Sequence, residues 1–98
     1  MTTTGASASS TVRVTVVHAP ACHFCDDART TLAKLADTYA IDVELIEAGS
    51  DRGRGLLAEH RAGMFPLVLI DEAYFSVGRL PRKKLRKLLD ARSAAAMA

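Results

Sequence analysis

The 98-residue sequence has only two cysteines, no tryptophan and no apolar run long enough for a transmembrane helix. Two cysteines in a single motif cannot form the disulfide framework of a small secreted domain. The net charge of +2 is too small to indicate nucleic acid by itself, and no aromatic residues interleave with the basic ones to stack on bases. We therefore expect neither nucleic acid nor a membrane among the partners.

Neither end of the sequence has the pattern of a folded or a targeting segment. Residues 1–10 lack the basic and apolar regions of a signal peptide, and residues 93–98 are mostly alanine. We expect a disordered tail over residues 1–10, one domain over residues 11–92 and a frayed end over residues 93–98. The expected location is the cytoplasm, and the expected state is a monomer.

The motif Cys22-His23-Phe24-Cys25 directly follows a β-branched apolar run and opens an amphipathic helical pattern. A helix N-terminus presents unpaired N–H groups and a partial positive charge, which stabilise a thiolate. Two cysteines three residues apart can also close into a disulfide within the first turn. Helical periodicity places Cys25 on the buried stripe and Cys22 at the exposed tip. The motif therefore predicts thiol–disulfide exchange, in which Cys22 attacks and Cys25 resolves.

Alternation and periodicity predict the other elements. Strands are expected over residues 12–17, 41–47, 67–70 and 74–77, the second near an edge, the third central and the last two forming a hairpin. The first helix carries an apolar face made of Cys25, Ala28, Leu32, Leu35, Ala36 and Tyr39. A short helix, weakened by two glycines, runs from Ser50 or Asp51 to near Gly63, and a final helix begins at Pro81. The order indicates an α/β fold, a four-stranded mixed sheet with helices on both faces.

Residues 12–92 resemble a thioredoxin-fold protein, and within that group the small glutaredoxin-like proteins. The resemblance rests on the first strand, the C-x-x-C at a helix start, a proline before the third strand and a glycine turn before the last helix. In detail, Cys22 to Asp26 is similar to the C-H-x-C-[DE] signature of a glutaredoxin-like subgroup, which also tends to have a V-P-like pair and a G-R turn. The resemblance implies the order β-α-β-α-β-β-α and a dithiol–disulfide oxidoreductase active in electron transport.

The resemblance also implies how substrate is held. The peptide bond before Pro66 is expected to be cis, and the backbone of Phe65 is expected to pair with substrate as an added strand. The expected substrate contacts are His23, Phe24, Phe65, Pro66, Gly78 and Arg79. No metal and no tightly bound cofactor is expected. The implied partners are a disulfide-containing protein or small thiol and a reductase or thiol reductant, with glutathione or an equivalent low-molecular-weight thiol as co-substrate.

Three groups of residues each allow two interpretations. His18, Cys22, His23 and Cys25 offer four nitrogen and sulfur ligands, so the chain is alternatively a non-enzymatic module that binds zinc, a bridged cluster or a partner protein. Phe24 and Phe65 either pack or contact an apolar substrate. The last basic run is either a solvated face or a docking surface for an acidic protein or the carboxylates of a small thiol. This run consists of Arg79, Arg82, Lys83, Lys84, Arg86 and Lys87.

Overall fold

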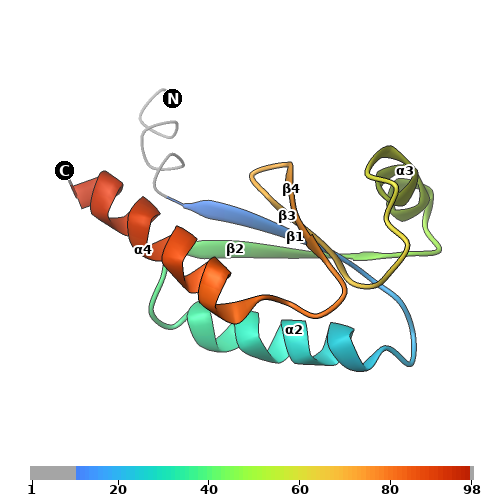
Figure 1. Cartoon of the computed structure of the whole chain (residues 1–98), viewed down its shortest axis with the longest axis horizontal. Helices are drawn as coiled ribbons and strands as arrows, with labels where there is room; N and C mark the ends of the chain where they lie inside the picture. Colours follow the sequence, from blue (N-terminus) through green and yellow to red (C-terminus); the bar gives the residue numbers. More distant parts are fainter. Residues whose placement is uncertain (1–10, 98) are drawn as a thin grey trace.

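The computed structural model describes the chain from residue 11 to residue 97, with side chains as far as residue 94. Seven elements follow one another in the predicted order (Figure 1). In chain order they are β1 (Val12–His18), α2 (His23–Leu35), β2 (Ile41–Glu47), α3 (Asp51–Glu59), β3 (Leu67–Ile70), β4 (Ala73–Val77) and α4 (Arg82–Met97). None of the described helices is long and apolar enough to span a bilayer.

The strands form one mixed sheet in the order β2-β1-β3-β4. β1 pairs in parallel with β2, and β3 pairs antiparallel with both β1 and β4. The predictions that β2 lies at an edge, that β3 is central and that β3 and β4 form a hairpin are confirmed. The four residues of β3 are all buried, which explains why this strand reads as an unbroken apolar run.

Helices cover both faces of the sheet, as predicted. On one face, α2 and α4 pack against β1, β3 and β4, and Leu32 and Leu85 are at most 1% exposed in that core. On the other face, α3 and the following loop cover Val17, Ile46 and Leu67 (Figure 1). The smaller second core lies at the end of the sheet where β1 finishes and β3 begins.

A two-residue turn joins β3 to β4. Asp71 and Glu72 both have positive φ, 50° and 72°, which is the backbone of the tight hairpin turn that matches strand twist. The turn is shorter than predicted, and β4 therefore begins at Ala73 instead of Tyr74. The Asp71 carboxylate accepts the backbone N–H of Arg13 at 3.0 Å and pairs with Arg92 of α4 at 2.6 Å. This side chain joins β1, the hairpin and the last helix.

α2 is shorter than predicted, because the chain turns after Leu35. Ala36 is the C-cap and is exposed, so its place on the apolar face was wrong. The next residues, Asp37 and Thr38, are of types that favour turns over the interior of a helix. The N–H of Tyr39 donates a hydrogen bond to the carbonyl of Leu35 at 2.8 Å, which closes the turn. The turn lets the Tyr39 hydroxyl donate a hydrogen bond to Asp90 of α4.

The ends of the other two helices also differ from prediction. α3 ends at Glu59, short of Gly63, because Arg61 adopts a left-handed conformation with φ 50°. α4 remains helical to Met97, past residue 92, where a frayed end was expected. Alanine has the highest helix propensity, and the extension is rich in alanine. The expected tail over residues 1–10 lies outside the described residues.

Candidate functional site

Strand register brings three separate segments to one end of the sheet. Val17 of β1 is opposite Leu67, and Leu67 is opposite Val77 of β4. The loop that leads from β1 to the cysteines, the proline before β3 and the glycine after β4 therefore meet at this end. The Gly78 N–H donates to the carbonyl of Pro66 at 3.0 Å, which extends the ladder by one step.

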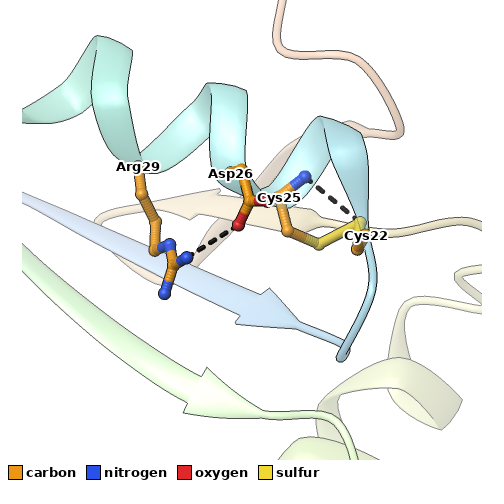
Figure 2. Close-up of a disulfide and its surroundings, with 4 residues drawn as sticks. All are labelled: Cys22, Cys25, Asp26 and Arg29. Carbon is orange, nitrogen blue, oxygen red and sulfur yellow. Dashed lines mark hydrogen bonds and ion pairs between the residues drawn. A yellow bond between two sulfur atoms is a disulfide. The ribbon is translucent and has the colours of Figure 1, made fainter.

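The two cysteines form a disulfide across the start of α2, with Cα atoms 5.1 Å apart (Figure 2). Ala21 takes a left-handed conformation with φ 52°, and the next residue, Cys22, returns to an extended one. Cys22 thereby becomes the N-cap of α2, and its Sγ accepts the N–H of Cys25 at 3.1 Å. The helix N-terminus thus directs a backbone donor at the Cys22 sulfur, which stabilises a thiolate there.

The cysteines differ in exposure in the predicted sense. Cys22 is half-buried at the helix tip, whereas Cys25 is 2% exposed on the face of α2 that packs on the sheet. An incoming disulfide can therefore reach Cys22 from solvent, but it cannot reach Cys25. This arrangement suits an attacking sulfur followed by a resolving one.

The two acids near the start of α2, Asp26 in its first turn and Asp27 directly after it, are paired with arginines. Asp26 accepts from Arg29 at 2.7 Å on the same helix (Figure 2). Asp27 pairs with Arg82, the first residue of α4. These arginines offset the negative charge that would otherwise oppose a thiolate at the helix start. The second pair was not predicted, because 55 residues separate its members.

The proline before β3 has the expected geometry. The Phe65–Pro66 peptide bond is cis, and Pro66 is fully buried. Among residues 11–97, the backbone N–H and carbonyl of Phe65 form no backbone hydrogen bond. These two groups are therefore available to an added strand.

Apolar side chains are exposed on either side of the site. Phe24, between the cysteines, is 38% exposed, and Met64 is 53% exposed. Gly78 has φ +77°, and a Cβ there would lie 3.1 Å from the terminal methyl carbon of Met64, so the methionine lies over the glycine. Sequence reasoning missed Met64, although its place two residues before the proline could have indicated it.

The remaining predicted site residues lie at the surface. His23 and Arg79 are exposed, and Phe65 is half-buried. Within the described part of the chain, no three His, Cys, Asp or Glu side chains gather where they could hold a metal ion. The four-ligand arrangement with His18 and His23 therefore has no geometric support.

No protein-family model matches the sequence, and no curated protein matches it. Among solved structures, a point mutant of thioredoxin from Halobacterium salinarum NRC-1 is similar, with a TM-score of 0.61 and 19% sequence identity. The match covers 84% of this chain and 74% of that chain. The predicted thioredoxin-like fold is confirmed, and the chain is a thioredoxin-fold protein whose C-x-x-C pair is closed as a disulfide.

Proposed function

We propose that the protein is a glutaredoxin-like dithiol–disulfide oxidoreductase that reduces disulfides of proteins or low-molecular-weight thiols. The observation that carries the proposal is the pairing of a solvent-accessible N-cap cysteine with a buried one. Cys22 receives a backbone N–H at 3.1 Å, and Cys25 is 2% exposed. Cys22 therefore provides a stabilised nucleophile, and the buried Cys25 can react only with the sulfur of Cys22.

In the first step, the Cys22 thiolate attacks one sulfur of the substrate disulfide. A bond forms between Cys22 and that sulfur, the substrate S–S bond breaks, and the other substrate sulfur leaves as a thiolate. In the second step, Cys25 loses its proton to solvent and attacks the Cys22 sulfur. The Cys22–Cys25 disulfide forms, the bound sulfur leaves as a thiolate, and the substrate has gained two electrons.

The oxidised form must then be reduced by a second partner. Two equivalents of a low-molecular-weight thiol such as glutathione, or one dithiol of a reductase, supply the two electrons and the protons. The reaction requires no tightly bound cofactor. Because the cytoplasm maintains such a reducing thiol pool, it is the proposed location.

Substrate positioning is assigned to the segment before β3. The free N–H and carbonyl of Phe65 support an added-strand contact with a polypeptide. Exposed Phe24 and Met64 would bury apolar side chains of the same substrate. Phe65 itself is half-buried.

Two cysteine variants test the mechanism. Cys22→Ser is expected to abolish turnover of a disulfide-bonded polypeptide with dithiothreitol as reductant, because the attacking sulfur is lost. Cys25→Ser is expected to accumulate a Cys22–substrate mixed disulfide, seen as the matching mass increase by mass spectrometry. Full reductase activity in Cys22→Ser would show that the proposed mechanism is wrong.

The reduction potential of the cysteine pair separates the possible roles. The protein is equilibrated across dithiothreitol or glutathione redox buffers, and the oxidised fraction is read by mass spectrometry. A value near or below about −200 mV would support a reductase, and a value near about −120 mV would instead indicate an oxidant. If a stoichiometric metal copurifies anaerobically and no redox-active disulfide forms, the cysteines are ligands of a binding module.

A further inference from the structure

The turn after β4 and the first turn of α4 border an open hollow of about 580 Å³, which we call the α4 hollow; residues 79–84 line it, and four of these six are basic. Residues 79–87 contain six basic residues and no acidic one. Since the whole chain has a net charge of +2 and this segment contributes +6, the rest of the chain carries a net charge of −4. Positive charge is therefore concentrated in this segment, and four of its six cations line the α4 hollow.

Most of the cations that line the α4 hollow are available to a ligand. Arg82 is paired with Asp27, but within the described side chains no ion pair joins Arg79, Lys83 or Lys84 to an acid. The Lys84 ammonium lies 5.0 Å from the centre of the Phe75 ring, which is a cation–π contact. Three cations in one concave surface favour an anionic ligand.

The α4 hollow begins one residue after Gly78 of the candidate redox site. Gly78 bonds to Pro66, and the next residue, Arg79, is the first that lines the hollow. Asp27, two residues after Cys25, is tied to the hollow through Arg82. A polypeptide held at the disulfide therefore lies within reach of these cations.

We propose that the α4 hollow binds an acidic segment of the disulfide-bearing polypeptide that the protein reduces. This inference rests on the proposed function and names its substrate class. A small thiol with a pair of carboxylates would leave part of the cationic surface unmatched, whereas a run of aspartate or glutamate residues can match Arg79, Lys83 and Lys84 together. The exposed apolar Phe24 and Met64 across the site also suit a polypeptide more than a hydrophilic tripeptide.

The test uses three peptides that share one intramolecular disulfide and differ only in three flanking residues, which are Glu, Gln or Lys. Glutathione disulfide is the fourth substrate, and dithiothreitol regenerates the dithiol. We expect kcat/KM for the Glu peptide to exceed that for the Gln peptide by about fivefold at an ionic strength of about 0.15 M, with the Lys peptide lowest. The preference should grow at about 0.01 M, where the Debye length is about 30 Å instead of about 8 Å.

Charge-removing variants test whether the preference for the Glu peptide depends on the α4 hollow. In the double variant Arg79→Gln/Lys83→Gln, the Glu-to-Gln ratio of kcat/KM should fall to between about one and two. The double variant Arg86→Gln/Lys87→Gln is the matched control, because it removes two charges from the same helix outside the hollow, and it should keep a ratio near five. Far-ultraviolet circular dichroism verifies that each variant is folded.

Each other outcome overturns the inference in a distinguishable way. Equal rates for the three peptides would refute the acidic preference and leave the proposed reductase intact. A glutathione disulfide rate that exceeds all peptide rates and falls in the Arg79→Gln/Lys83→Gln variant would identify a small anionic thiol as the occupant. Reduction of none of the four substrates would refute the proposed function, and this inference with it.

Discussion

Gly53 in α3 should tolerate no side chain, although it lies in a helix where glycine is unfavourable. A Cβ built on Gly53 would lie 2.0 Å from the carbonyl oxygen of Glu47, and real Cβ contacts below 3.0 Å are essentially never seen. The helix would have to move by about 1 Å to accept alanine. Gly55, two residues further along the same helix, has nothing within 4 Å of its Cβ position and is a matched control.

The expected change in the free energy of unfolding follows from three contributions. Overpacking against backbone costs about 1–3 kcal/mol. Displacement of the helix also weakens the Ser50 cap, whose hydroxyl oxygen accepts the Gly53 N–H at 3.0 Å, at a cost of about 1 kcal/mol. The higher helix propensity of alanine returns about 1 kcal/mol. Gly53→Ala should therefore destabilise the protein by about 2 kcal/mol, and Gly55→Ala should stabilise it by about 0.5–1 kcal/mol.

Urea denaturation of the oxidised protein, followed by far-ultraviolet circular dichroism, measures both changes. In thermal unfolding, Gly53→Ala should lower Tm by roughly 8–16 °C. Because α3 covers Leu67, beside the buried proline of the site, the loss should also be visible as faster amide exchange at the start of β3. If Gly53→Ala is as stable as Gly55→Ala, the close approach of α3 to β2 is wrong.

Two further predictions concern charged contacts. Burial opposes ionisation of Asp71, but a backbone N–H of β1 and the Arg92 guanidinium outweigh it and hold the pKa of Asp71 below 3.8. The stability that the Asp71 carboxylate contributes is therefore present above pH 3.8 and is lost as the pH falls through the lower pKa of the folded state. On acidification below about pH 4, the wild type should therefore lose more unfolding free energy than Asp71→Asn does. Separately, Arg82→Gln leaves Asp27 unpaired near the start of α2 and should slow alkylation of reduced Cys22 at pH 7 by about twofold.

Controls for these two predictions use other ion pairs of the chain. Arg54 pairs with Asp51 at the start of α3, so Arg54→Gln removes a comparable exposed pair and should leave the alkylation rate unchanged. Arg52→Gln removes the hydrogen bond that lowers the pKa of Glu44 and leaves Asp71 in place, so it measures how much of the acid loss a second exposed pair contributes. If wild type and Asp71→Asn lose equal unfolding free energy on acidification, Asp71 is not the source of the acid sensitivity.

Patterns that depend on near neighbours in the chain could be predicted from the sequence. Alternation indicated β1 and β2, the apolar run of β3 indicated a central strand, and helical spacing put Cys25 on the buried side and Cys22 at the tip. The resemblance further supplied the cis bond before Pro66. Helix ends were less predictable, because a single left-handed residue such as Arg61 or a turn after Leu35 decides them.

Contacts between residues far apart in the chain were decided only by the tertiary structure. Nothing in the sequence indicates that Gly53 must lie against the carbonyl of Glu47, or that Arg82 pairs with Asp27 beside the cysteines. The position of Met64 over Gly78 likewise depends on how the loop before β3 lies beside the turn after β4. Local periodicity selects each element and its buried face, whereas the packing of elements against one another selects which side chains meet at the site.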